Sequence, residues 1–213
     1  MATYDLDEQE RMDELKAWWK RWGTVVMIGA AVAIAAAAGW RYWQSHTLTQ
    51  NLEAAAVYEK LTESLASNDA KGARDAGGML IDKYKGTAYA PRAALLLAKL
   101  NVVSKDLKGA QTQLEWAVAN SKEPAVKDLA RLRLAGVQLD QKLYDAALKT
   151  LGNPHSDAFA FRFHDLKGDV LLAQGKQADA RAAYQAAFEK MEKDNPYRNI
   201  VELKLDAMGG AVK

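Results

Sequence analysis

The 213-residue sequence contains no cysteine. This absence excludes disulfide bonds, thiolate catalysis, cysteine-based metal sites and an N-terminal lipid on cysteine. The sequence also has only four prolines and few runs of β-branched residues, whereas stretches rich in Ala, Leu, Lys, Glu and Gln are long. Such a composition predicts an all-α chain. Basic and acidic residues are nearly balanced, and a net charge of +2 does not indicate the basic surface that nucleic-acid binding requires.

Residues that carry chemistry are scarce as well. There are three histidines, and no two have the i, i+4 spacing of a helical zinc site. One set could be read as a metal cluster, but it lacks a recognised ligand spacing and is better explained by loop and surface positions: His155, Asp157, His164 and Asp165. The carboxylates are scattered, and no two are spaced as a catalytic acid–base pair. We therefore predict no catalytic residue, no cofactor-binding residue, no cofactor and no metal ligand, which makes an enzyme the least favoured class.

Long uncharged runs are also rare, and the one exception covers residues 23–40, GTVVMIGAAVAIAAAAGW. Its 18 residues fall within the range of about 17–25 that a membrane-spanning helix needs. They exceed the core of about 7–15 residues of a signal peptide. The preceding 22 residues carry six acids, unlike a short basic leader. We predict a permanent transmembrane helix over 23–43, with cleavage near AAAAGW as the open alternative.

Aromatic residues flank this run on both sides, as amphipathic rings do at lipid headgroup level. The predicted membrane-interface residues are Trp18, Trp19, Trp22, Trp40, Arg41, Tyr42 and Trp43. Basic residues are concentrated before the run, whereas Arg41 stands nearly alone after it until Lys60. The positive-inside rule then predicts a cytoplasmic tail over 1–22 and a domain over 44–213 outside the membrane, in the periplasm of a Gram-negative bacterium.

Two features of the N-terminal region have competing interpretations. The spacing of Met12, Leu15, Trp19 and Trp22 predicts an amphipathic helix that leads into the membrane, and an interfacial anchor without a protein partner is favoured. Small residues in the span, such as the pair Gly29 and Ala33, either permit close packing against another membrane helix or simply make the anchor weakly hydrophobic.

The remaining sequence contains an internal repeat. The pentapeptide DAKGA at 69–73 returns as DLKGA at 106–110, 37 residues later. Small residues recur with it: Ala98 and Ala110, Ala135 and Ala147, Gly168 and Ala180. A period near 34 with small residues where paired helices touch is typical of tetratricopeptide repeats. We predict units near 91–124, 128–154 and 161–193, a degenerate pair over 46–84, and a capping helix over 196–208 opened by Asn195 and Pro196.

In tetratricopeptide arrays the first helix of each pair lines a concave groove. This pattern places apolar and basic residues in the groove as candidate partner-binding positions: Leu95, Lys99, Val102, Leu129, Leu132 and Leu139. From the third unit it adds Arg162, Asp165 and Asp169. An apolar groove suits partner helices or unfolded segments. Alternatively, another helix of the same chain fills it, because large exposed apolar patches are rare.

Several short segments are distinctive in their exact sequence: ELKAWWKRWG at 14–23 and GWRYWQSH at 39–46, and further AALLLAKL at 93–100, RLRLAGVQL at 131–139, DAALKTL at 145–151 and DLKGDVLLAQGKQADARAAY at 165–184. Through these segments the chain resembles a known family, the YfgM family of ancillary SecYEG translocon subunits. The resemblance covers essentially the whole chain.

The resemblance implies a non-enzymatic inner-membrane protein with one span and a periplasmic tetratricopeptide-like domain. Its implied partners are the SecYEG translocon, a PpiD-like membrane-anchored periplasmic chaperone and unfolded secreted clients, besides membrane lipid. The implied role is to help pass secreted proteins from the channel to periplasmic chaperones, and a regulatory role is attributed to the family's cytoplasmic tail. Two alternatives stay open beside this role: a membrane-anchored scaffold for another envelope assembly, and a cleaved soluble periplasmic chaperone or adaptor.

Overall fold

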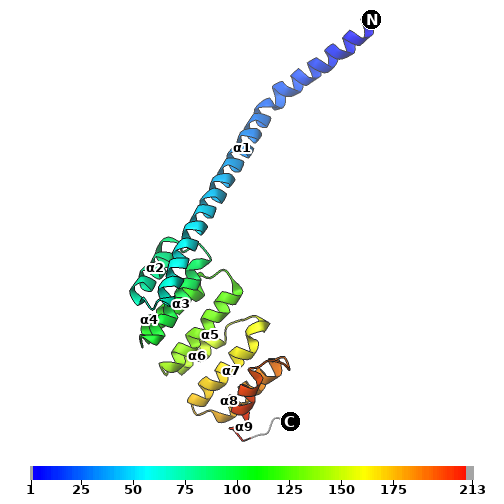
Figure 1. The fold of residues 1–213 in the computed structure, drawn as a ribbon. Coiled ribbons are helices and arrows are strands. Elements are labelled where there is room, and N and C mark those ends of the chain that lie inside the picture. Colours follow the sequence, from blue (N-terminus) through cyan, green and yellow to red (C-terminus); the bar gives the residue numbers. More distant parts are fainter. Residues whose placement is uncertain (1, 210–213) are drawn as a thin grey trace. The chain divides into compact units, whose positions relative to one another are not determined.

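The computed structural model describes residues 2–209, with side chains from residue 11 onward. All regular secondary structure in this range is helical (Figure 1). The helices are α1 (Ala2–Ala66), α2 (Ala70–Lys83), α3 (Tyr89–Val103), α4 (Leu107–Asn120), α5 (Pro124–Asp140), α6 (Tyr144–Leu151), α7 (Asp157–Ala173), α8 (Gln177–Lys190) and α9 (Arg198–Asp206). The prediction of an all-α chain is confirmed.

The chain forms two compact units, residues 1–50 and residues 51–213. We call the first the N-terminal unit and the second the repeat domain. Helix α1 runs through the boundary, so its residues 51–66 belong to the repeat domain. The predicted limits of tail, span and outer domain are defined by a membrane and stay predictions.

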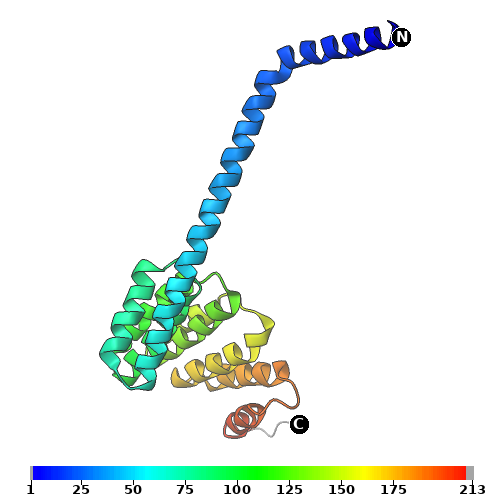
Figure 2. The same ribbon diagram turned by 45° about the horizontal axis from the view of Figure 1, so that its top comes forward.

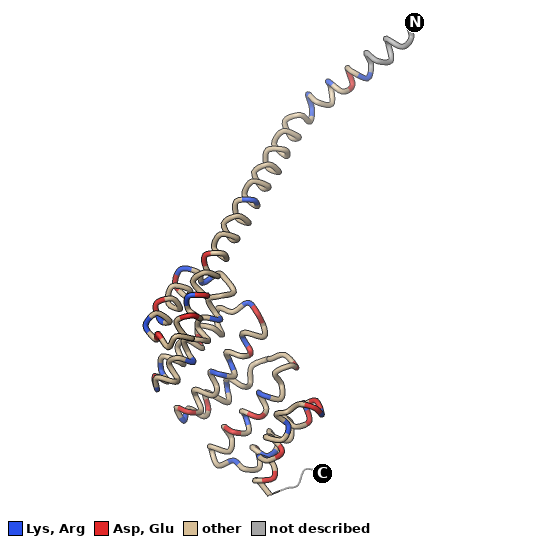
Figure 3. Tube along the Cα trace, in the orientation of Figure 1, with Lys and Arg blue, Asp and Glu red and all other residues tan. Residues whose placement is uncertain are grey.

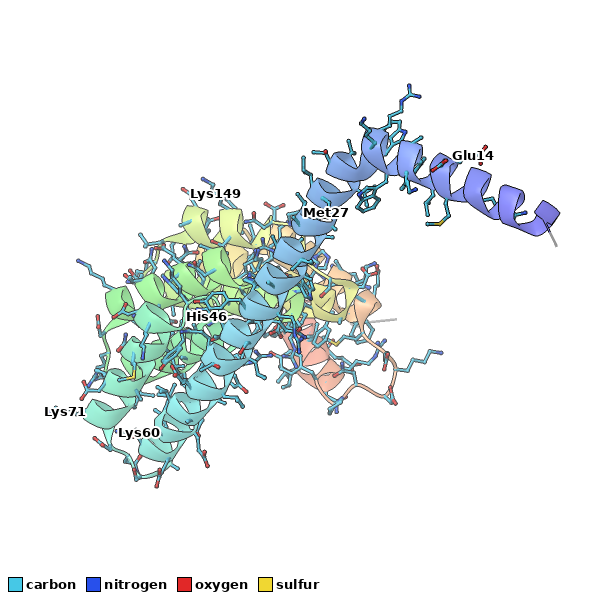
Figure 4. The ribbon with its side chains drawn as sticks, turned by 90° about the horizontal axis from the view of Figure 1, so that it is seen from above. Glu14, Met27, His46, Lys60, Lys71 and Lys149 are labelled. Carbon is cyan, nitrogen blue, oxygen red and sulfur yellow. The ribbon has the colours of Figure 1, made fainter. Side chains whose placement is uncertain are left out.

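In the N-terminal unit, α1 contains a stretch without charged residues, visible as the long tan part of the tube in Figure 3. Within residues 11–66, α1 is long and apolar enough to cross a membrane. Figure 4 shows that α1 bends between Glu14 and Met27. Gly23 lies in this interval, and the indole ring of Trp19 covers its Cα so closely that an added Cβ would be 3.1 Å from Trp19 Cε2. Glycine is a common site of helix bending because it has no side chain to support the turn.

As far as α8, the repeat domain is an array of antiparallel helices in which each helix packs on the next along the chain, and α9 packs on α8 in a different direction (Figures 1 and 2). Helix α3 also contacts α5, and α5 contacts α7. The first helices of successive pairs therefore lie side by side, as in a tetratricopeptide solenoid. Each layer touches only its neighbours, so the stability of the array is a sum of local contacts.

The core consists of four apolar clusters, each shared by neighbouring helices. The small residues of the sequence repeat lie inside these clusters or at the helix crossings: Ala98, Ala110, Ala135, Ala147 and Ala180 are at most 2% exposed. At Gly168 an added Cβ would overlap the ring of Tyr184 on α8. Small residues thus mark the points where paired helices approach most closely, as the sequence pattern predicts.

The turns inside the helix pairs explain the repeated pentapeptide. Residues with positive φ recur at Asn68, Lys105, Lys142 and Gly175, where the first helix of each pair ends. After Asn68 and Lys105, the side chains of Asp69 and Asp106 cap α2 and α4 by accepting bonds of 2.9 Å from the N–H groups of Gly72 and Gly109. A Cβ at either glycine would collide with the capping carboxylate. The motif D-x-K-G is therefore a helix start whose glycine leaves room for the cap.

Two helix boundaries qualify the sequence interpretation. Helix α6 ends at Leu151, three residues before Pro154, a residue that cannot continue a helix. Helix α9, by contrast, begins at Arg198 and not at Pro196. The side chain of Asn195, three residues before the start of α9, accepts a bond of 3.0 Å from the N–H of Tyr197, so it forms a local turn ahead of the helix and does not cap it.

Candidate partner-binding surface

A groove lies between α3 and α5 on the surface of the repeat domain, with a volume of about 360 Å³. We call it the α3–α5 groove. Its lining residues are Ala98, Lys99, Val102, Leu114, Arg133, Gly136, Val137 and Asp140. The floor is apolar and the rim is charged, because Lys99, Arg133 and Asp140 are exposed. Gly136 helps to keep the groove open, since nothing lies within 4 Å of where its Cβ would be.

Arg133 is held at the rim of this groove by α3. Its guanidinium Nη1 donates to the carbonyl oxygen of Leu95 over 3.5 Å, and the partial burial of the guanidinium in an otherwise exposed side chain lowers the pKa of this arginine from its ordinary value. Arg131 on the other side of α5 donates a shorter bond of 2.6 Å to the carbonyl of Pro154. Both side chains therefore connect α5 to neighbouring segments.

The six predicted partner-binding residues do not share one surface. Lys99 and Val102 line the α3–α5 groove, where Val102 is 37% exposed. Leu95 is only 5% exposed and belongs to the core cluster of α3, α4 and α5, against which Leu129 also packs. Leu132 and Leu139 pack against the cluster of α5, α6 and α7. The structure thus brings together only Lys99 and Val102, and the partner-binding role of all six stays a prediction.

In the third unit, polar side chains connect α7 to α8 and α9. Lys204 Nζ of α9 lies 2.8 Å from Asp165 Oδ1 and 2.7 Å from Asp169 Oδ1, both on α7. Tyr197 donates to Asp165 over 3.1 Å, and Tyr184 donates to Asp169 over 2.7 Å. We call these five residues the Asp165 cluster. In this unit, another helix of the chain, α9, packs against the predicted groove residues Asp165 and Asp169, as the alternative interpretation expects.

Burial and charge both act on the Asp165 cluster. Burial raises the pKa of Asp165 above its usual range, against the opposing effect of its hydrogen bond and charge interaction with Lys204. Burial alone would lower the pKa of Lys204, but its bonds to Asp165 and Asp169 and the charges of both carboxylates outweigh this and raise it. Burial and the bond to Asp169 raise the pKa of Tyr184. The cluster therefore holds Lys204 charged and Tyr184 neutral across the physiological range.

The position of Asp165 in the repeat explains why it needs a partner. It stands three residues before Gly168, as Leu95 stands before Ala98 and Leu132 before Ala135. Leu95 and Leu132 pack into or against apolar clusters. Asp165 is as inaccessible as Leu95, each at 5% exposure, but carries a carboxylate. A buried charge is costly unless it is paired, so α9 supplies the cation that this layer requires.

Two further polar side chains, His155 and Asp128, have structural roles. The imidazole of His155, one member of the set that could be read as a metal cluster, stacks on Phe163 with 4.2 Å between ring centroids. Asp128, which the sequence did not single out, is 3% exposed and accepts bonds of 2.9 and 2.8 Å from the N–H and hydroxyl of Ser156. Across residues 11–209, no three His, Asp or Glu side chains converge in a way that could hold a metal ion.

The predicted membrane-interface residues all lie on α1 and are exposed within the N-terminal unit. Trp18, Trp19 and Trp22 are 50%, 53% and 48% exposed. On the other side of the apolar stretch, Trp40, Tyr42 and Trp43 are 65%, 76% and 60% exposed. Arg41 is exposed with them. Exposed rings of this size are unusual on a monomeric soluble protein, and their role at a membrane surface stays a prediction.

Comparisons with known proteins place this architecture in a family. The family model of a tetratricopeptide repeat-like domain matches residues 16–210. A protein of Neisseria gonorrhoeae named ancillary SecYEG translocon subunit is 32% identical over 209 residues, which cover 98% of this chain and 100% of that protein. Proteins of the same name are 31% identical in Escherichia coli, over 89% of this chain and 90% of theirs, and 29% identical in Haemophilus influenzae, over 87% and 90%.

These matches extend over α1 and the repeat domain together, and both the fold and the family point to a non-enzymatic role. The family and the apolar helix also indicate a membrane anchor. The resemblance seen in the sequence is confirmed: the chain belongs to the tetratricopeptide repeat-like family of ancillary SecYEG translocon subunits.

Proposed function

We propose that this protein is an ancillary subunit of the Sec translocon that helps pass secreted proteins from the channel to periplasmic chaperones. A transmembrane segment over 23–43 holds it in the bacterial inner membrane, with residues 1–22 in the cytoplasm and the repeat domain in the periplasm. The observation that carries the proposal is the near full-length similarity to proteins named for this assembly, spanning both the apolar helix and the repeat domain.

The charge distribution of α1 supports the orientation. Arg11, Lys16, Lys20 and Arg21 precede the apolar stretch, and only Arg41 follows it closely. Basic residues near the ends of a span are retained in the cytoplasm. The repeat domain then emerges on the opposite side, where secreted chains leave the channel and where a PpiD-like chaperone would be a partner.

The α3–α5 groove supports contact with unfolded segments. Its apolar floor offers Ala98, Val102, Leu114 and Val137 to a side chain of an extended or helical client. The rim residues Lys99, Arg133 and Asp140 carry both charge signs, so the groove does not select clients of one charge. A volume of about 360 Å³ fits one or two apolar side chains, which suits weak and general recognition.

Neighbouring valines on α3 provide a matched test of this groove. Val102 lines it, whereas Val103 is more exposed, at 73%, and does not. A photoreactive amino acid at position 102 should crosslink a secreted chain arrested in the translocon at least ~10 times more efficiently than one at 103, because an apolar pocket that holds a side chain is worth about 1.4 kcal/mol or more. Crosslinks are counted after purification of the arrested complex.

The result that contradicts groove binding is equal crosslinking at both positions, since Val103 is the more accessible residue. Val102→Asp and Val103→Asp provide the complementary pair, and only the first should weaken client contact. Circular dichroism of both variants confirms that the array remains helical. Leu132→Asp and Leu139→Asp are less suitable for this purpose, because both leucines pack against a core cluster and their replacement would also destabilise the packing of α5.

A further inference from the structure

The residues of α1 that precede the span form a helix with two distinct faces. Leu15, Trp19 and Trp22 follow one another at spacings of four and three residues, and Met12 and Trp18 flank them on the same side of the helix. All five side chains are between 48% and 60% exposed, so nothing in the N-terminal unit covers this face. The side opposite this face carries Asp13 and Ala17, and Lys16 and Lys20 lie between the two sides. Segment 11–22 is therefore amphipathic, although Arg11, four residues before Leu15, is a charged residue on the apolar side.

This apolar face continues into the span but changes direction there. Figure 4 shows the bend of α1 between Glu14 and Met27, and the Trp19 ring rests against Gly23 inside that interval. If α1 were straight and perpendicular to the membrane, Met12 would stand about 16 Å beyond Gly23, at 1.5 Å per residue. An apolar face at that height would be in water. A bend allows the same face to return to the membrane.

From these observations we infer that segment 11–22 lies along the membrane surface. The side chains of Met12, Leu15, Trp19 and Trp22 insert among the parts of the lipid chains next to the headgroups. The occupant of the uncovered apolar face is thus lipid. Two details favour lipid over a protein partner: the face is continuous with the predicted membrane span, and three of its residues are tryptophans, which concentrate at headgroup level.

The charged residues complete the lipid contact. Lys16 and Lys20 border the apolar face on one side and Arg21 borders it on the other. Long basic side chains at the edge of an inserted face extend to the headgroup phosphates while their methylene groups remain among apolar atoms. The pair of Lys16 with Asp13, at 3.2 Å, is highly exposed and leaves Lys20 and Arg21 for the phosphates. The segment then fixes the depth of the span and prevents it from sliding along its axis.

The absence of cysteine allows a direct test by spin labelling of the full-length chain in lipid bilayers. Single cysteines are introduced as Met12→Cys and Leu15→Cys on the apolar face, and as Asp13→Cys and Ala17→Cys on the opposite face as matched controls. Each label is then exposed to oxygen, which concentrates in lipid, and to a nickel chelate, which stays in water. The ratio of the two accessibilities reports the depth of the label.

We expect labels at 12 and 15 to be at least ~5 times more accessible to oxygen, relative to the nickel chelate, than labels at 13 and 17, because an in-plane helix buries only its apolar face. Equal, water-like ratios at all four positions would overturn the inference. Since it rests on the proposed anchoring, an Ala33→Cys label in the span is measured in parallel. A water-exposed label at 33 shows that the anchor itself fails, whereas a lipid-buried label at 33 with water-like ratios at 12 and 15 refutes only the surface helix.

Discussion

Replacing Gly168 with alanine should lower the free energy of unfolding of the repeat domain by about 2 kcal/mol. Gly168 lies where α7 crosses α8, and its Cβ would overlap the ring of Tyr184. Tyr184 is 1% exposed and its hydroxyl is bonded to Asp169, so the ring cannot move aside without breaking that bond. The overlap therefore outweighs the gain of about 1 kcal/mol that alanine offers over glycine inside a helix. Thermal unfolding followed by circular dichroism measures the difference.

Gly136 provides the matched control because it also lies inside a helix of the array. Nothing surrounds the position of its Cβ within 4 Å. Gly136→Ala should therefore stabilise the domain by about 0.5–1 kcal/mol, the usual preference of a helix interior for alanine. The same substitution thus has opposite signs at the two sites. If Gly168→Ala proved as stabilising as Gly136→Ala, the close helix crossing described for the third unit would be wrong.

Replacing Lys204 with methionine should destabilise the C-terminal end of the array by about 3 kcal/mol. The substitution keeps the length of the side chain but removes the cation from the Asp165 carboxylate, whose side chain is only 7% exposed. An unpaired buried charge is the costly state, because neither water nor another cation reaches it. Amide hydrogen exchange should show that α9 loses protection first, while the helices α3–α6 keep theirs.

The double variant Asp165→Leu, Lys204→Met separates the cost of an orphaned charge from the loss of packing. It places leucine where the first two units have Leu95 and Leu132. A buried ion pair replaced by apolar residues of similar size is commonly neutral or stabilising, so the double variant should return to within about 1 kcal/mol of the original chain. A double variant as unstable as Lys204→Met alone would show that the ion pair itself is indispensable.

The same ion pair should weaken at high pH. Folding raises the pKa of Lys204 and that of Tyr184. A group whose pKa is higher in the folded chain contributes its full stability below its unfolded pKa and loses it as the pH rises through the folded value. The pKa values of lysine and tyrosine side chains in an unfolded chain are about 10, so α9 should lose protection from hydrogen exchange above roughly pH 10. The double variant, which lacks the lysine, should show a smaller alkaline loss than the original chain.

The repeat architecture could be predicted because tight helix crossings restrict residue size. Ala98, Ala135 and Gly168 recur at intervals of 37 and 33 residues, and the positive-φ turns at Lys105, Lys142 and Gly175 have the same intervals. Because this limit on residue size recurs in every unit, it can be recognised from a single sequence. The sequence places the start of α9 two residues early, because Asn195 and Pro196 are typical of helix starts but also of the turn that precedes one.

The binding surface could be predicted only in part. Spacing along α3 places Leu95, Lys99 and Val102 on one face, but spacing does not show where the neighbouring helix covers that face. Leu95 is covered by α4 and α5, whereas Lys99 and Val102 remain at the groove. One part of the Asp165 cluster could be noticed in the sequence, because Asp165 stands at the repeat position where the first two units have leucine. Its partner Lys204 lies 39 residues later in a helix outside the repeat and could not be inferred from the period.

The central claim is that this chain is a membrane-anchored subunit of the Sec translocon. The most direct test is purification from native membranes in mild detergent, with a tag before Met1 and mass spectrometry of the retained proteins. We predict that the full-length chain is recovered together with translocon subunits and with a periplasmic chaperone. Recovery of the tag only on a short N-terminal fragment would contradict this claim, since the AAAAGW segment would then be a cleavage site and the repeat domain a soluble protein.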